Sequence, residues 1–388
     1  MTGTLYDHLT AVIITGALFV AAVVAVPTLS YVNLLYVDQQ QLRNVALETL
    51  KTMLLDTGYP LNWGSDDDFN QSNLERFGLA LSDSSSSYML DPDKVQRLVV
   101  NNSLGWVEYE TVRQLLGLQG YGFSIRILPP FNVTVKDISP PGLKNQEFEV
   151  TVTFNDKKPI PNAVVEANIV YSYLVDPGET ELDNKYAIRY TQGKGITNEL
   201  GKCNIQTQID DPLGRVQENL LIIIKTTVAD VTTVTMMYKE GSSPEGLAKI
   251  NVYGDSLNLT RPEKYDPNAN IWICDIAMIT EDGLIRLYNG TKSDNLNYGS
   301  KDLWNKIFNG LKSMGPVFMV FDFNAVEKGG GRQGALLVGP YPNHMGSRVT
   351  HYGSDRQSFT SGGSVTLSRA VNISGMTYIV ELTLWKEM

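Results

Sequence analysis

The hydrophobic positions of the chain begin with a long run that contains no charged residue. From Leu9 to Val37 the sequence consists mostly of Ala, Val, Ile and Leu, and it exceeds the ~20 residues that a helix needs to span a bilayer. This pattern predicts a membrane helix. The alternative is a cleaved secretory signal, but its apolar region is ~7 to 15 residues long and follows Lys or Arg. Met1 to His8 contains neither, so the sequence favours a retained helix.

The helical periodicity continues past the charge-free run. Four apolar residues, termed here the apolar stripe, recur at helical spacing among polar ones: Leu42, Ala46, Leu50 and Met53. The pattern predicts one continuous helix from Leu9 to Leu55, ~70 Å long at 1.5 Å per residue, with a kink at Pro27. Because the stripe lies beyond the charge-free run, either other copies or the protein's own head must cover it.

From Phe123 onward the apolar residues alternate with polar ones. Phe148, Val150, Val152 and Phe154 alternate with Glu and Thr, which is typical of a strand with one buried face. Similar short strands separated by turns follow up to Tyr238, and this spacing predicts an antiparallel sandwich. Before them, Asp91 or Asp93 is placed to cap a short helix from Lys94, and a second short helix is expected at 108–116.

A polar break at 240–244 precedes a third region. Strands are expected there at 248–253, 271–280, 316–323, 334–338 and 378–385, with one amphipathic helix from Asp302 to Met314. This region therefore reads as a β-dominated α+β domain.

Three short segments resemble known surface proteins. The apolar helix with a mid-helix proline, followed by an amphipathic half and a β-rich head, resembles the type IV pilin class. The stretch from Leu55 to Gly64 (LDTGYPLNWG) and the ending from Asn372 to Trp385 are similar to archaeal pilin-like surface proteins. This resemblance implies assembly through the helix, and it places Asp7 near an acid that pairs with a neighbour's N-terminal amine.

A second resemblance concerns the sandwich. Two turns, Lys158 to Ala163 and Ile196 to Lys202, resemble the strand-turn marks of immunoglobulin-like domains on prokaryotic surface proteins. The expected fold is mainly β with a long N-terminal α-helix, an immunoglobulin-like sandwich and a β-rich α+β distal domain. The expected units are residues 1–60 (transmembrane or assembly helix), 61–122 (small helical collar), 123–240 (sandwich) and 245–388 (distal domain).

Composition narrows the function classes. Of the 388 residues 19% are charged, with 42 acids against 32 Lys and Arg and a net charge of −10. This balance excludes a disordered chain and a basic nucleic-acid binder. With only three His and two Cys, little is left for a zinc cluster or a disulfide framework. Cys203 and Cys274 each lie on the apolar face of an expected strand, in two separate expected domains, so we expect both to stay free.

Two features of the sequence indicate opposite orientations for the head. Lys and Arg flank the apolar run only on its C-terminal side, at Arg43 and Lys51, which by charge alone places the body inside the cell. Six Asn-X-Ser/Thr sequons favour an external body and are candidate N-glycosylation sites: Asn70, Asn101, Asn132, Asn258, Asn289 and Asn372.

No motif indicates catalysis. His344 and His351, with Asp322 and Asp355, are candidates for a metal or hydrolase site, but their spacing matches no standard zinc pattern. Neither a Gly-x-Ser-x-Gly elbow nor a His-Glu-x-x-His motif occurs. Tyr59 and Trp63 are interpreted as packing anchors between helix and head. We therefore expect no catalytic residues, no metal and no cofactor.

These observations favour a structural protein of the cell surface. The expected function is a subunit of a pilin-like filament or appendage, assembled with other copies through Asp7, Pro27 and the apolar stripe, with the membrane as its other partner. The first alternative is a monomeric membrane-anchored adhesin or ligand-binding module. The second is a surface hydrolase that uses the two histidines and an acid.

Overall fold

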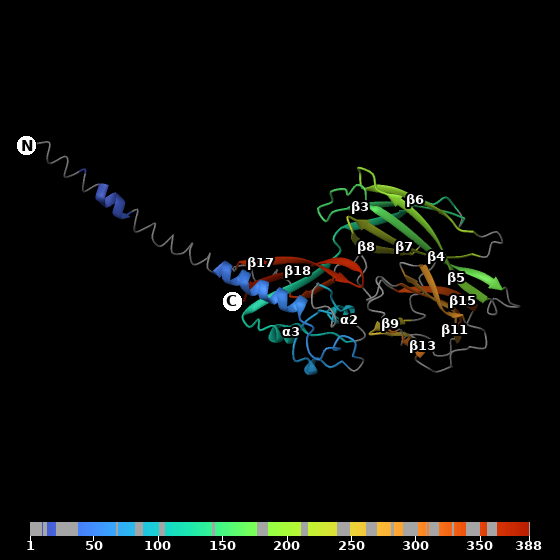
Figure 1. Ribbon diagram of the computed structural model, residues 1–388, viewed down its shortest axis with the longest axis horizontal. Coiled ribbons are helices and arrows are strands. Elements are labelled where there is room, and N and C mark those ends of the chain that lie inside the picture. Colours follow the sequence, from blue (N-terminus) through green and yellow to red (C-terminus); the bar gives the residue numbers. More distant parts are fainter. Residues whose placement is uncertain are drawn as a thin grey trace, which may run out of the picture.

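The fold is dominated by antiparallel strands (Figure 1). The structure is a computed structural model that describes residues 10, 14–20, 38–66, 69–81, 88–100, 105–141, 144–176, 185–210, 216–238, 249–260, 270–280, 283–289, 302–307, 309, 318–327, 330–338, 350–354 and 363–387.

The prediction of one long N-terminal helix is wrong for the described residues. Among these residues, helix is described chiefly at 14–20 and 38–55. None of the described helices is both long enough and apolar enough to cross a membrane. The 38–55 helix buries its apolar side in the core of the head. It is therefore an element of the globular body and not part of a free rod. Pro27 lies outside the described residues.

The 38–55 helix lies along a sheet formed by strands from distant parts of the sequence (Figure 1). Asp38 on this helix accepts a hydrogen bond of 3.0 Å from Lys386 Nζ on the sheet. The sheet order is β16-β1-β18-β17, with bounds Thr350–Gly353, Tyr121–Leu128, Met376–Lys386 and Ser364–Ile373.

Within this sheet, β1 pairs with β18 along its whole length. A strand that directly follows the expected collar is thus joined to one from the expected distal domain. β18 alternates buried and half-buried residues almost throughout, as a strand with one core-facing side does.

Two further sheets form the expected sandwich. The outer sheet has the order β2-β3-β6 and the second sheet the order β5-β4-β7-β8. Their bounds are Asn132–Asp137, Asn145–Thr153 and Lys202–Gln208 for the outer sheet, and Lys185–Ile196, Val164–Asp176, Val216–Val228 and Val231–Tyr238 for the second. The predicted alternation is confirmed for Phe148, Val150 and Val152, which are buried in the core between these sheets. It is wrong for Phe154, which follows β3 and is 49% exposed.

The sandwich carries a third layer that the sequence analysis did not anticipate. Residues on the other side of the second sheet, including Val170 and Leu221, share a core with Ile279 and Phe318. These last two belong to a sheet of order β12-β11-β14-β15, with bounds Gly283–Asn289, Asn270–Thr280, Phe318–Glu327 and Gly330–Val338. The second sheet is therefore buried on both faces, which explains the nearly continuous apolar run in β7.

The expected distal helix from Asp302 to Met314 is also wrong for residues 302–307, which the structure describes. Asp302–Ile307 forms strand β13, which pairs with β10 (Ser256–Thr260) in the small sheet β13-β10-β9, with β9 at Lys249–Tyr253. Leu303 and Ile307 are four apart, a spacing that suits one face of a helix and equally one face of a strand. Pairing with β10 decides between the two.

The described collar contains three short helices. They are η1 (Gln71–Asn73), α2 (Pro92–Gln96) and α3 (Tyr109–Leu115). Of the two predicted caps, Asp91 and Asp93, the structure shows Asp91, whose side chain accepts the backbone N–H of Asp93 at the start of α2.

Candidate functional site

The 38–55 helix is followed by a tight turn, which residues of the collar hold in place. Gly58 has φ 73°, in the region that favours glycine, and its N–H donates to Asp56 Oδ1 at 2.8 Å. A Cβ at Gly58 would lie 2.8 Å from the carbonyl oxygen of Arg76, so a side chain would not fit there. The guanidinium of Arg76 in turn forms a 3.0 Å ion pair with Asp56.

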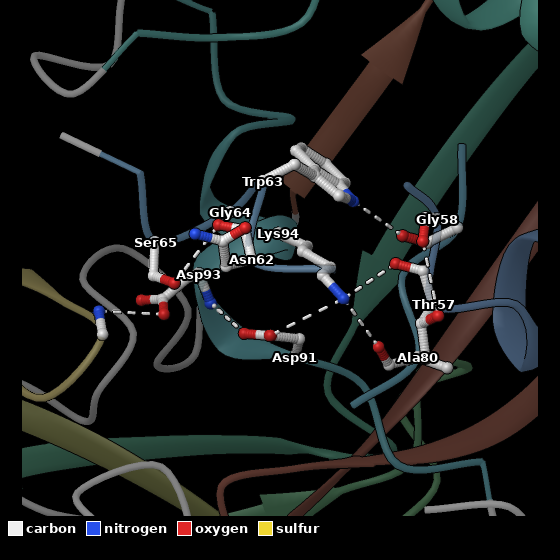
Figure 2. Close-up of polar contacts among 12 residues, drawn as sticks. Thr57, Gly58, Asn62, Trp63, Gly64, Ser65, Ala80, Asp91, Asp93 and Lys94 are labelled. Atoms are coloured by element: carbon white, nitrogen blue, oxygen red, sulfur yellow. Dashed lines mark hydrogen bonds and ion pairs between the residues drawn. The ribbon is translucent and has the colours of Figure 1, made fainter. Parts of the chain in front are cut away.

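A buried lysine lies at the centre of this junction (Figure 2). Lys94, on α2, is fully buried, and its Nζ donates to the carbonyl oxygens of Thr57 at 2.8 Å and Ala80 at 3.0 Å. It also lies 3.8 Å from Asp91 Oδ2. A buried ammonium is costly unless its donors are used. Here they join the segment after the helix, the 76–81 segment and α2.

Two glycines permit this close approach. A Cβ on Gly64 would lie 2.5 Å from the backbone nitrogen of Lys94, and one on Gly78 would lie 2.1 Å from the carbonyl oxygen of Asp56. Trp63 is buried beside them and donates from Nε1 to the Gly78 carbonyl oxygen at 3.3 Å. The motif from Leu55 to Gly64 therefore builds the junction between helix and head.

The network continues from α2 to the rest of the collar. Arg97 Nε donates to the Gly64 carbonyl oxygen at 3.0 Å, and its guanidinium lies 4.6 Å from the centre of the Phe69 ring. Asp93 Oδ2 accepts the backbone N–H of Gly254 at 2.9 Å, between β9 and β10. Because these charges are buried and contact the protein itself, the junction is suited to rigid attachment rather than to binding a ligand.

The apolar stripe is the main correction to the expected assembly site. Its exposed fractions are 3% for Leu42, 0% for Ala46, 2% for Leu50 and 0% for Met53, and all four belong to the core of the head. The head thus covers the whole stripe, for which the sequence had predicted contacts with other copies. Asp7 and Pro27, the other expected assembly residues, lie outside the described residues.

The expected packing anchors behave differently from each other. Trp63 is buried against Phe69 and Phe77, with ring centres 6.0 and 5.8 Å away. Tyr59 is 50% exposed, so its ring is covered much less than that of Trp63. Its backbone contacts the collar through a bridge to Arg76.

The candidate residues for a metal or hydrolase site do not come together among the described residues. His351 is exposed on β16, whereas Asp322 on β14 is buried and accepts a hydrogen bond of 2.6 Å from Ser172 Oγ. His344 and Asp355 lie outside the described residues. No group of three His, Cys, Asp or Glu suited to a metal occurs in the described part of the chain.

Sequence reasoning missed a polar contact between two layers of the fold. Asp275 on β11 is the register partner of Asp322, and its Oδ2 accepts the N–H of Ile188 on β5 at 2.8 Å. Arg286 Nε lies 3.1 Å from the same oxygen. Burial raises the pKa of the Asp275 carboxyl above its usual value, although Arg286 opposes this shift. A lone Asp inside an apolar strand was the available signal.

The two cysteines are free and buried, Cys203 on β6 and Cys274 on β11. Burial raises the pKa of the Cys203 thiol, which lowers its reactivity.

The sequons differ in accessibility. Asn70 and Asn132 are exposed and Asn372 is half-buried. Asn258 and Asn289 lie in β10 and β12, and Asn101 lies outside the described residues.

A small cleft of about 170 Å³ opens where the second sheet extends past the third layer. Glu166, Lys194 and Lys225 contribute charged side chains to its lining, and Ile279 and Phe318 contribute apolar ones. Lys194 and Glu166 form an ion pair of 2.5 Å. The cleft is large enough for a small polar molecule.

Comparisons with known proteins identify no family. Neither a family nor a curated protein matches the sequence. The structure of Tp47, the 47-kilodalton lipoprotein of Treponema pallidum, is 13% identical with a TM-score of 0.17, and the match covers 55% of this chain and 50% of that one. A DUF4466 family protein from Parabacteroides merdae is 8% identical with a TM-score of 0.18, covering 67% of this chain and all of that one. The chain spans half the length of Tp47, and similarities this weak do not bear on its fold or function.

Proposed function

We propose that the protein is a non-enzymatic structural subunit of a cell-surface filament or appendage. In this proposal the apolar N-terminal segment holds the subunit to the membrane and to other copies, and the head faces outward. The observation that carries the proposal is a set of large apolar side chains with little cover from the chain itself: Ile14 is 55% exposed, Leu18 66%, Phe19 70% and Val20 62%.

Such exposure is costly in water. Burying one side chain of this size is worth ~1.5 to 3 kcal/mol, so leaving four of them in water forfeits several kcal/mol per subunit. Lipid or the same segment of other copies would recover that free energy. The apolar stripe does not serve this purpose, because the head already buries it. The proposed assembly contacts therefore lie before residue 38.

The junction supports the proposal by holding the 38–55 helix firmly against the head. The 38–55 helix shares the core of the head, and Lys94 fixes the turn that follows it. The outward side of the helix is polar, including Gln40, Arg43 and Glu48, as expected for a surface that faces water. In an assembled filament, each head would hold a fixed orientation relative to its helix.

The alternative proposal is a monomeric membrane-anchored adhesin or ligand-binding module. The small cleft lined by Glu166, Lys194 and Lys225 favours it, because a ligand-binding module needs a concave site with polar groups. The polar outward side of the 38–55 helix is equally compatible with single copies.

The test combines imaging of native cells with a charge substitution. Leu18→Glu with Phe19→Glu is expected to abolish filaments and to release the protein from the membrane fraction, with the head still folded by circular dichroism. Gln40→Glu with Gln41→Glu, which adds equal charge on the exposed side of the other helix, is the matched control. Filaments that persist in the Leu18 and Phe19 variant would refute the proposal. Single wild-type copies on native cells, with an intact Met1 by mass spectrometry, would favour the anchored module; a mature N-terminus at Thr4 would favour assembly.

A further inference from the structure

Asn132 presents an accessible sequon on the outer sheet of the sandwich. Its neighbours Phe131 and Val133 are buried in the sandwich core, so Asn132 and Thr134 project to the opposite, solvent-facing side of β2. Both are exposed. Among the described residues, none forms a hydrogen bond with the side chain of either one. The amide and the hydroxyl of the sequon are therefore both available to an enzyme.

The surroundings of Asn132 are also open and polar. β2 is an edge strand, since it pairs only with β3 in the described part of the sheet. The register partner of Asn132 is Thr153, and that of Thr134 is Thr151. The outer sheet, in which Figure 1 labels β3 and β6, lies on the outside of the head and away from the 38–55 helix.

Asn372 shows the opposite arrangement. Its Oδ1 accepts the N–H of Gly375 at 3.0 Å, and its backbone is bound on both sides to the 88–90 segment, through Tyr88 O at 2.8 Å and Leu90 N at 2.9 Å. Ser374, the third residue of this sequon, is only 7% exposed. An enzyme could not reach this hydroxyl without opening the collar from β17.

We propose that Asn132 carries an N-linked glycan on the open edge of the outer sheet, and that Asn372 carries none. The inference rests on the external location of the head in the proposed function. The donor would be an oligosaccharide on a polyprenyl phosphate carrier. Asn132 Nδ2 forms a bond to C1 of the first sugar while the bond from C1 to the carrier oxygen breaks. The carrier leaves as its phosphate anion, and the amide gives one proton to the base of the transferase.

The position of the glycan gives it a physical role. An open edge strand presents unpaired N–H and C=O groups that can pair with a second chain, and heads held close together on a cell surface would meet at high local concentration. A hydrated, bulky saccharide beside β2 keeps a second copy from pairing there.

The test uses three variants purified from native cells. N132Q and T134A both destroy the sequon, whereas T134S keeps it with an equally exposed hydroxyl. Intact-mass measurement is expected to show the same loss of saccharide mass in N132Q and T134A, with the wild-type mass pattern in T134S and in N372Q. Chemical cross-linking is expected to give more dimers in N132Q and T134A than in T134S.

Each other result overturns a stated part of the inference. Equal saccharide mass in N132Q and wild type would show that Asn132 is unmodified, and loss of mass in N372Q would show that the accessibility argument fails. Unchanged dimers would refute the shielding role. Protease treatment of intact cells separates the two proposals: a head that is digested but unmodified at Asn132 refutes the glycan alone, whereas a protected head refutes the external location.

Discussion

Replacing Lys94 with methionine tests the junction most directly. Lys94→Met keeps a long, unbranched side chain but removes the ammonium that donates to the carbonyl oxygens of Thr57 and Ala80. Both carbonyls lose that donor in a site where the lysine side chain is 0% exposed. The variant should therefore destabilise the helix-to-head connection without changing its shape.

The distances indicate which interaction dominates. At 3.8 Å, Lys94 Nζ and Asp91 are too far apart for a hydrogen bond, so most of the cost should come from the two carbonyls. A buried group left unsatisfied costs ~1 to 3 kcal/mol, which gives ~2 to 6 kcal/mol for the pair. The lower half of this range already equals a large share of the ~5 to 15 kcal/mol by which a typical domain is stable.

Urea unfolding of the full chain in detergent measures this free energy, with the m-value checked for constancy. Lys158→Met is the matched control, because Lys158 pairs with Asp156 at the surface, and the unfolding midpoint should not move. The Asp91→Asn background separates the two contributions, since Asn still caps a helix. If Lys94→Met costs much less in that background, the ion pair dominates and the reasoning from carbonyls is wrong. If the unfolding midpoint of Lys94→Met equals that of the control, Lys94 does not stabilise the junction and the reasoning is refuted.

Three further changes test the fold. Leu50→Glu should destabilise the head by more than ~2 kcal/mol, whereas the control Glu48→Ala should leave the thermal midpoint unchanged. A Leu50→Glu head that stays stable and only fails to assemble would contradict the burial of the stripe. Gly78→Ala places a Cβ 2.1 Å from a backbone oxygen and should lower the thermal midpoint, whereas Gly16→Ala, with nothing within 4 Å, should not. Burial raises the pKa of Asp275, so the folded state favours the protonated carboxyl. The contribution of Asp275 to wild-type stability should therefore be lost as the pH rises from the pKa of an unfolded Asp, ~4, through the higher pKa of the folded state. Urea unfolding across this pH range should show a smaller loss of stability with rising pH in Asp275→Asn than in the wild type. The same pH profile in both proteins would contradict this role of Asp275.

Local patterns predicted the elements of the sandwich well. The alternation at Phe148, Val150 and Val152 correctly identified which face of β3 is buried, because the two-residue period is set by the backbone itself. The cap at Asp91 was likewise local, since a short side chain needs only the next turn of the chain.

The partners of those faces could not be predicted from local pattern. The apolar stripe correctly indicated a buried face, but its period holds no information on whether a neighbouring copy or the chain's own head covers it. The same limit applies to β1, whose partner β18 lies far away in sequence. At Leu303 and Ile307 the spacing suited helix and strand equally, and pairing with β10 determined the outcome.

The junction was only partly visible in the sequence. The stretch from Leu55 to Gly64 was noticed as a resemblance, yet Lys94, which holds it, was predicted only as the start of a short helix. Its burial depends on Gly64 and Gly78, which let the backbones approach. Such a contact among three segments has no periodic signature.

The pairing of β1 with β18 has a consequence for the order of synthesis. The ribosome completes the 38–55 helix and β1 early, but the strand that joins β1 at Val380, Leu382 and Leu384 appears only after nearly all of the described chain. Until then, the apolar stripe and the inner face of β1 remain without their final cover. A chain interrupted before β18 would keep that apolar surface exposed, and exposed apolar surface is what chaperones and proteases recognise, so the core of the head closes only once β18 is made.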